Sequence, residues 1–252
     1  MQELLALAIR LADEAATLIR EVRAGGFAVS AKADETPVTV ADTRAEALIV
    51  AGLRAAAPEI PVVAEEEVAA GRITKPAETY WLVDPLDGTR EFAAGRDEFT
   101  VNIGLIINGA PVLGAVASPA LHELHFGLAG QGAWRRRAGG EQRISARRAP
   151  PEGLTVMASR HYADAPELAA FLARYKIAAL TNIGSALKFL RLAEGAADFY
   201  PRLGRTMEWD TAAPQAVLEA AGGAVRTEDG AALRYGKPGW ENPDFCAWGL
   251  LE

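Results

Sequence analysis

The sequence predicts an α/β protein with an α+β first half and an alternating α/β second half. Between residues 99 and 137, β-branched and aromatic runs are separated by turn signals, which predicts an antiparallel meander. From Leu154 onward, strand-like and helix-like segments alternate, which predicts layered α/β structure. The segment from Arg143 to Gly153 contains two prolines and no apolar periodicity, so we expect halves at residues 1–145 and 146–252.

Two helices and two buried strands are expected at the start of the chain. Apolar residues recur at helical spacing from Leu4 to Val22, before Gly25-Gly26, and a second helix is expected from about Asp42 to a stop before Pro58. A polar loop should join these helices. The expected strands are Ile60 to Ala64, which runs into Glu65-Glu66-Glu67, and Tyr80 to Val83, which runs into Asp84.

The remaining elements follow from the same patterns. Asn108-Gly109 is a strong hairpin signal within the meander. The meander strands are expected at residues 99–105, 110–117, 121–126 and 133–137. In the second half, strands are expected at 154–158, 178–181, 198–200, near 224 and at 245–248, and helices at 164–174, 185–194 and 210–221.

Composition limits the class of protein. The 252 residues include 26 basic and 33 acidic side chains, a net charge of −7, which argues against a nucleic acid as the main partner. The single Cys246 excludes an intramolecular disulfide and fits a reducing cytoplasm. The apolar N-terminus is interrupted by Glu3 and Arg10, so no signal peptide or transmembrane segment is expected there. We expect a cytoplasmic monomer or homodimer; peripheral association with the inner membrane stays open.

The stretch from Trp81 to Thr89 carries the clearest chemical signal. Pro85 favours an extended Asp84, and the turn residues up to Gly88 can fold Asp87 back towards Asp84. Two carboxylates about 4 Å apart repel by roughly 4 kcal/mol at an effective dielectric near 20, so such a pair shares a proton or holds a cation. Oxygen ligands without a thiol favour Mg²⁺. Thr89 then opens a predicted helix whose free N–H groups could hold a phosphate.

Each of these residues also has a purely structural interpretation. The Asp84–Thr89 segment could be an Asx turn, Asp42 and Asp210 could be N-caps, and Glu65 to Glu67 could be a solvated acidic turn. These alternatives weaken together, because several strand and helix ends with carboxylates are what a shared metal site requires. His122 and His125 are three apart in a predicted strand and therefore make a poor metal pair.

Four blocks together resemble the inositol monophosphatase family of magnesium-dependent, lithium-sensitive phosphatases, and within it the bacterial CysQ-type bisphosphate nucleotidases of sulfur metabolism. The blocks are Pro37-Val38-Thr39-Val40-Ala41-Asp42, Ala64-Glu65-Glu66, the run from Trp81 to Phe92, and Met207-Glu208-Trp209-Asp210-Thr211-Ala212-Ala213. The resemblance extends from about Lys32 to the C-terminus. It implies a layered α-β-α-β-α sandwich of the sugar-phosphatase type.

The resemblance also implies roles for individual residues. Glu65, Asp84, Asp87 and Asp210 would bind Mg²⁺ through their side chains and Leu86 through its carbonyl, so that the first half carries most of the metal site and the second half completes it. Gly88 and Thr89 would hold the scissile phosphate. Asp42 with Thr89 would orient the attacking water, which makes Asp42, Thr89 and Glu65 the expected catalytic residues. The substrate-binding set would comprise Leu86, Asp87, Gly88, Thr89 and Asp210 together with His161, Ser185, Lys188 and Arg202.

Four of these residues would surround the nucleotide and its second phosphate: His161, Ser185, Lys188 and Arg202. Lys188 is expected in the first turn of a helix, where a cation opposes the helix dipole unless an anion offsets it. The structural interpretation is that Lys188 and Arg202 extend along the surface into solvent. Two departures from the subgroup leave the nucleotide contacts in doubt: Pro214 replaces a usual glycine, and Ala186 replaces a common serine.

The expected activity is therefore removal of the 3'-phosphate of adenosine 3',5'-bisphosphate to give AMP and phosphate, with the sulfated nucleotide of sulfate assimilation as a further candidate substrate. An inositol or sugar monophosphatase is the alternative enzyme. A regulatory, nucleic-acid-associated module of the same fold is the alternative outside catalysis, and the net negative charge argues against it.

Overall fold

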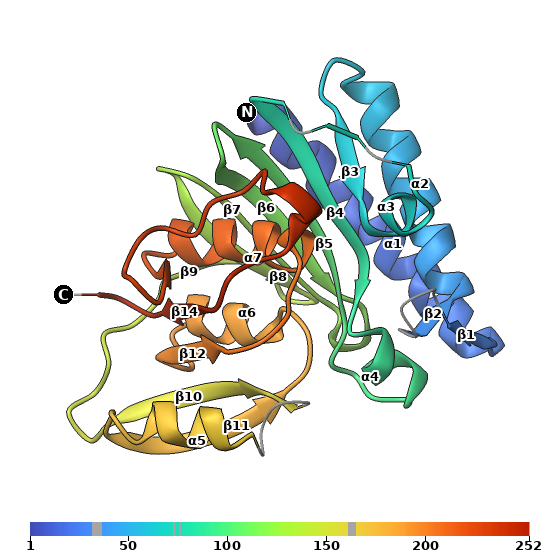
Figure 1. Ribbon diagram of the computed structural model, residues 1–252. Helices are drawn as coiled ribbons and strands as arrows, with labels where there is room; N and C mark the ends of the chain where they lie inside the picture. The colour runs from blue at the N-terminus through green and yellow to red at the C-terminus, as the bar shows by residue number, and fades with distance from the viewer. Residues whose placement is uncertain (32–36, 73, 76, 161–164, 252) are drawn as a thin grey trace.

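The computed structural model describes residues 1–31, 37–72, 74–75, 77–160 and 165–251. Five layers of helices and sheets follow one another across the molecule (Figure 1). Helices α1 (Gln2–Gly25) and α2 (Val40–Ala56) form the first layer and cover one face of a seven-stranded sheet. Helices α6 (Leu187–Ala193) and α7 (Glu208–Ala220) lie between that sheet and a five-stranded sheet, whose outer face is covered by α5 (Pro166–Leu172). This confirms the expected sandwich.

The seven-stranded sheet carries the expected meander. Its strand order is β3-β4-β5-β6-β7-β8-β9, and only the β3–β4 pair is parallel. Asn108 and Gly109 both have positive φ in the β5–β6 hairpin, as a type I′ turn requires. The strands are β3 (Val62–Ala64), β4 (Thr79–Asp87), β5 (Thr100–Ile107), β6 (Ala110–Ser118), β7 (Glu123–Leu128), β8 (Gly132–Arg137) and β9 (Gly140–Ile144).

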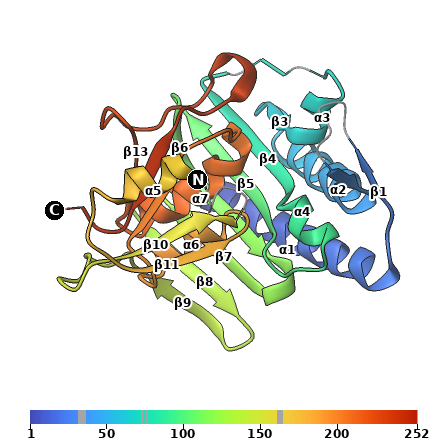
Figure 2. The same cartoon turned by 60° about the horizontal axis from the view of Figure 1, so that its bottom comes forward.

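The second sheet has the order β11-β10-β12-β14-β13 and mixes parallel and antiparallel pairs. Figure 2 shows this half on the side of the large sheet opposite α1 and α2. Its strands are β10 (Leu154–Ser159), β11 (Ile177–Ile183), β12 (Phe199–Arg202), β13 (Ala224–Thr227) and β14 (Phe245–Trp248). The short elements are β1 (Val29–Ala31), β2 (Pro37–Thr39), α3 (Glu65–Ala69), α4 (Thr89–Ala93), and 3-10 turns at Pro119–Leu121 and Pro238–Trp240.

Helix α7 lies very close to the seven-stranded sheet, over a strip of glycines. A Cβ atom added to Gly114 would lie 2.1 Å from the carbonyl oxygen of Ala213, and one added to Gly104 would lie 2.8 Å from the Ala213 nitrogen. The glycines on β5 and β6 therefore let the backbone of α7 rest directly on the sheet. This contact fixes the distance between the sheet and α7, the helix that carries Asp210.

Several expected boundaries were wrong. Strand β4 does not end at Asp84 but continues through Pro85 to Asp87, with its pairing to β5 interrupted between those two aspartates. Strand β9 was not expected and overlaps the start of the expected junction at Arg143, and β1 pairs with β2 around the expected polar loop. Helix α6 begins at Leu187 rather than Ser185, because Ser185 has φ 53° and cannot belong to a right-handed helix.

Candidate active site

A cavity of about 500 Å³ lies where the two halves meet, and both contribute side chains to it. The first half contributes the end of β4 and residues of α3 and α4. The second half contributes the β11–α6 turn, the end of β12 and the start of α7. Its predicted site residues are Glu65, Asp84, Leu86, Asp87, Gly88, Thr89, Ser185, Lys188, Arg202 and Asp210. The structure thus brings these ten residues together. His161 lies outside the described residues.

The turn from Asp84 to Thr89 is shaped by its own backbone. The N–H of Leu86 donates to Asp84 Oδ1 at 3.0 Å, which folds the chain after Pro85 as an Asx turn does. Gly88 has φ 94°, and a Cβ there would lie 2.8 Å from the carbonyl oxygen of Glu98. A side chain at Gly88 would therefore both strain the turn and collide with the neighbouring loop.

Asp42 and Thr89 meet as expected, although they are 47 positions apart. Thr89 Oγ1 lies 2.9 Å from Asp42 Oδ1 and 3.0 Å from the Leu86 carbonyl oxygen. Asp42 Oδ2 accepts from the Thr39 N–H at 2.8 Å and from the Thr39 hydroxyl at 2.7 Å. Thr39 is the N-cap of α2 and Asp42 is its third residue, so the simple N-cap interpretation of Asp42 was wrong. One oxygen of Asp42 anchors the helix and the other faces Thr89.

The other two carboxylates of the site also stand in first helical turns. Asp210 is the third residue of α7, not its N-cap, and its Oδ2 accepts from the Met207 N–H at 2.9 Å. Glu65 is the first residue of α3, and the next N–H, that of Glu66, donates to Glu46 Oε2 at 2.6 Å. Because helix N-termini carry partial positive charge, they stabilise the ionised carboxylates that stand there.

Burial and mutual repulsion dominate the electrostatics of this end of the cavity. Burial, followed by the charges of Glu65, Asp87 and Asp210, raises the pKa of Asp84 well above its usual range. Burial raises the pKa of Asp87 to about 6 despite the opposing charge of Lys188. Burial and the charge of Asp87 raise the pKa of Asp210 to about 8. Four carboxylates held this close form a site that a bound cation would stabilise.

The donors present fit magnesium. They are carboxylate oxygens and the Leu86 carbonyl, with no thiol or imidazole among the described lining residues. Glu65, Asp84, Asp87 and Asp210 are the residues that would hold the ion. A hard cation with a preference for oxygen suits this set better than zinc or copper.

The cavity is also lined by basic residues close to these carboxylates. Lys188 is only 4 % exposed, and its Nζ donates to the carbonyl oxygens of Ile183 (3.3 Å) and Ser185 (2.5 Å) and lies 5.2 Å from the ring centroid of Tyr200. Burial lowers the pKa of Lys188 to about 8, with Asp87 opposing and Arg202 reinforcing that shift. Arg202, at the end of β12, is buried as well and donates to the carbonyl oxygen of Arg205. The alternative interpretation, in which Lys188 and Arg202 extend along the surface into solvent, was wrong because both side chains are buried.

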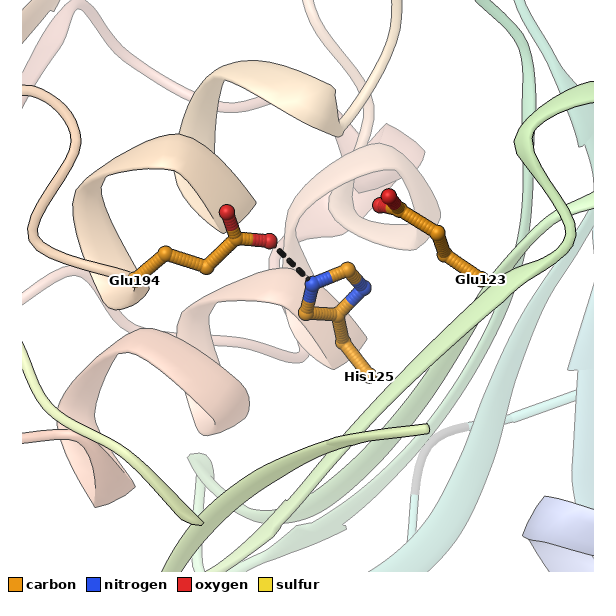
Figure 3. A group of neighbouring side chains, drawn as sticks. All are labelled: Glu123, His125 and Glu194. Atoms are coloured by element: carbon orange, nitrogen blue, oxygen red, sulfur yellow. Dashed lines mark hydrogen bonds and ion pairs between the residues drawn. The ribbon is translucent and has the colours of Figure 1, made fainter. Parts of the chain in front are cut away.

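A second acidic and histidine cluster lies away from the cavity (Figure 3). His125 on β7 is fully buried, and its Nε2 lies 2.5 Å from Glu194 Oε1 at the end of α6, with Glu123 beside them. Three arginines pair with the two glutamates: Arg135, Arg137 and Arg191. Their positive charge opposes a bound cation, so we interpret the cluster as an ion-pair network that joins the large sheet to α6. His122 is not part of this cluster; it lies in the turn before β7, with φ 53°, and not in the strand where it was expected.

Sequence reasoning missed this network and several residues of the cavity. Tyr200 and Arg205 line it, and Glu98 contacts the β11–α6 turn beside it. Tyr200 and Arg205 stand within three positions of Arg202, which was expected to contact phosphate, whereas Glu98 carries no metal or phosphate signal in the sequence. Among the described residues, no helix combines the length and the apolar character needed to cross a membrane.

Comparison with known proteins places these features in a family. The model of the inositol monophosphatase family matches residues 1–245. The chain is 43% identical over 239 residues to the 3'(2'),5'-bisphosphate nucleotidase CysQ of Escherichia coli O157:H7, covering 94% of this chain and 96% of that protein. It is 44% identical over 218 residues to CysQ of Escherichia coli K12, covering 86% and 87% of the two chains.

Solved structures agree with the sequence comparisons. CysQ from Bacteroides thetaiotaomicron superimposes with a TM-score of 0.82 at 32% identity, covering 100% of this chain and 99% of the other. An inositol monophosphatase from Anabaena superimposes with a TM-score of 0.79 at 28% identity, covering 99% and 91%. With a family model matched over nearly the whole chain and close relatives matched end to end, the resemblance predicted from four short blocks is confirmed: the chain belongs to the inositol monophosphatase family.

Proposed function

We propose that this protein is a magnesium-dependent phosphatase that removes the 3'-phosphate of adenosine 3',5'-bisphosphate to give AMP and phosphate. One observation carries the proposal: a single cavity is lined both by four carboxylates and by two buried cations, Lys188 and Arg202. A substrate with two phosphates can use both sets of groups, one phosphate through the metal and the other directly. The similarity to CysQ proteins supports the nucleotide class.

The residues of the chain have separable tasks in this reaction. Asp42 accepts hydrogen bonds from Thr39 and lies within hydrogen-bond distance of the Thr89 hydroxyl, so the pair can hold a water and take up its proton. The N–H groups at Gly88 and Thr89, at the start of α4, would hold the scissile phosphate. Family membership implies a divalent metal, and magnesium held by the carboxylates would supply positive charge to the phosphate and lower the pKa of water.

The second phosphate needs a different kind of site. Because it lies away from the metal, its charge has to be met by protein groups, and Lys188 and Arg202 are buried cations near Asp87 and Tyr200. Ser185 also lines the cavity, and His161 is proposed as a further nucleotide contact from sequence alone. The sulfated nucleotide of sulfate assimilation shares both phosphates and is proposed as an additional substrate. We propose a cytoplasmic location.

The test is phosphate release from adenosine 3',5'-bisphosphate and from inositol 1-phosphate at matched concentrations, with magnesium and with or without lithium. We expect a strong preference for the bisphosphate, no turnover in EDTA, and inhibition by lithium. A preference for the inositol ester would retain the metal chemistry and remove the second phosphate site from the proposal. No turnover of either, together with RNA retention in a filter-binding assay at moderate salt, would replace the enzyme by a binding module.

A further inference from the structure

Glu98 lies outside the sites described so far and joins three segments of the chain. It stands in the loop between α4 and β5, in the first half, with a side chain about one quarter exposed. Its carboxylate accepts two contacts from Arg160 Nη2, at 2.5 and 2.6 Å, and the N–H of Gly184 at 3.1 Å. Arg160 follows β10, and Gly184 follows β11, so a single carboxylate holds two loops of the second half.

The loop at Gly184 contacts Lys188, one of the two buried cations of the cavity. Lys188 donates to the carbonyl oxygens of Ile183 and Ser185, and Asp87 accepts a hydrogen bond from the backbone N–H of Ala186. Ser185 holds a positive φ of 53°, which a non-glycine residue adopts only when its surroundings stabilise it. The Glu98 contact to the Gly184 N–H lies immediately before that residue. Its loss would leave a backbone donor unpaired at the point where the turn is most strained.

The fit around Gly184 leaves little freedom for the loop to move. A Cβ atom added there would lie 2.7 Å from Cγ of Glu91, a buried residue of α4. The loop is therefore packed against the helix that follows the phosphate-binding turn. Contact with Glu91 and contact with Glu98 together fix it to the first half.

Glu98 also contacts the phosphate-binding turn, through its backbone. Its carbonyl oxygen lies 2.8 Å from where a Cβ of Gly88 would stand. One residue thus touches the turn that would hold the scissile phosphate and, through its side chain, the turn that carries Ser185. Its own negative charge near a phosphate site is offset by Arg160, with which it forms a close ion pair.

We infer that Glu98 is a positioning residue that sets the distance between the two phosphate sites and so selects substrates with two phosphates. This inference rests on the proposed function. Glu98 contacts no substrate in this arrangement; it acts through the Gly184–Ser185 turn. Replacing its side chain retains the backbone contact with Gly88, so we expect the second phosphate site to change more than the metal end of the cavity.

Two inhibitors separate these sites. AMP carries the 5'-phosphate and lacks the 3'-phosphate, so it probes the second site, whereas inorganic phosphate probes the metal end alone. Inhibition constants for both would be measured against bisphosphate hydrolysis in the wild type, Glu98→Ala, Glu98→Gln and Asp97→Ala. Asp97 is the matched control, because it is the adjacent acidic residue and pairs with Arg23 instead. Thermal unfolding would verify that each variant is folded.

For Glu98→Ala we expect the AMP inhibition constant to rise about tenfold or more, the effect of one lost charge-assisted contact, with the phosphate constant within about twofold. Glu98→Gln keeps an oxygen for the Gly184 N–H and should recover most of the AMP affinity. Equal changes in both constants, or no change in either, would overturn the inference. Absence of bisphosphate hydrolysis by the wild type would instead overturn the proposed function.

Discussion

The ion-pair network between β7 and α6 predicts a pH-dependent loss of stability when Glu194 is replaced by glutamine. Burial alone would raise the pKa of Glu194, but the hydrogen bond to His125 and the charges of His125, Arg191 and Arg135 lower it to about 2, from 4.5. At 1.36 kcal/mol per pKa unit, the ionised carboxylate contributes about 3 kcal/mol to the free energy of unfolding at pH 7. This agrees with the cost of breaking a buried ion pair.

The sign of the pH dependence follows from the lowered pKa. The contribution is complete above pH 4.5, where the unfolded chain is also ionised, and is lost as the pH falls towards 2. Wild type and Glu194→Gln should therefore differ by about 3 kcal/mol at pH 7 and by about 2 kcal/mol at pH 3.5. Glutamine keeps the size of the side chain, so packing changes little.

Urea unfolding followed by tryptophan fluorescence at the two pH values measures both differences. Glu141→Gln is the matched control: Glu141 pairs with Arg136 on the surface, where both side chains are more than one third exposed, and should cost less than about 0.5 kcal/mol. A cost below about 1 kcal/mol for Glu194→Gln at pH 7, or an equal cost at both pH values, would refute the reasoning.

Three further predictions concern the cavity. Asp87→Asn should reduce turnover at least about a thousandfold in a phosphate-release assay. Its unfolding temperature without metal should stay at or above that of the wild type, because one of four mutually repelling charges is gone. Near-normal activity would exclude Asp87 as a metal ligand. Thr89→Val should lower kcat by about a hundredfold or more and Thr89→Ser by only a few fold, because the hydroxyl beside Asp42 would orient the attacking water. Equal losses in the two variants would indicate a packing role for Thr89 instead. Lys188→Gln should raise KM for the bisphosphate at least about tenfold without changing the half-saturating magnesium concentration, and a shift in the magnesium requirement would place Lys188 in the metal site.

The carboxylate end of the cavity could be predicted because its signals are local. Pro85 and Gly88 define a turn between two aspartates, and Asp42 and Asp210 stand in the first turns of amphipathic helices. Proline, glycine and helix periodicity act within a few residues, so the sequence around each of these carboxylates predicts the local backbone geometry. What the strand pattern did not reveal is that β4 runs past Asp84, because the β5 partner, from Thr100, supports it across the irregularity.

The contacts of Glu98 and His125 could not be predicted, because their partners come from distant parts of the chain. A glutamate before a strand is normally a surface charge, and only the fold brings Arg160 and Gly184 to it. The side chain of His125 follows the ordinary alternation of a strand, which gives no sign of a partner. Its partner Glu194 lies 69 positions further along the chain. Tertiary packing, rather than local pattern, decides the role of both residues.

The strip of glycines under α7 makes part of the large sheet as intolerant of change as the cavity itself. Even a methyl group at Gly114 would meet the backbone of Ala213, one turn along the helix from Asp210, and would lift that aspartate with the helix. If every position were substituted in turn, we expect changes at Gly104 and Gly114 to reduce activity as much as changes at the catalytic residues, although neither glycine has a functional group. Sequence drift in this protein is thus constrained from beneath the active site by the need to keep two backbones in contact.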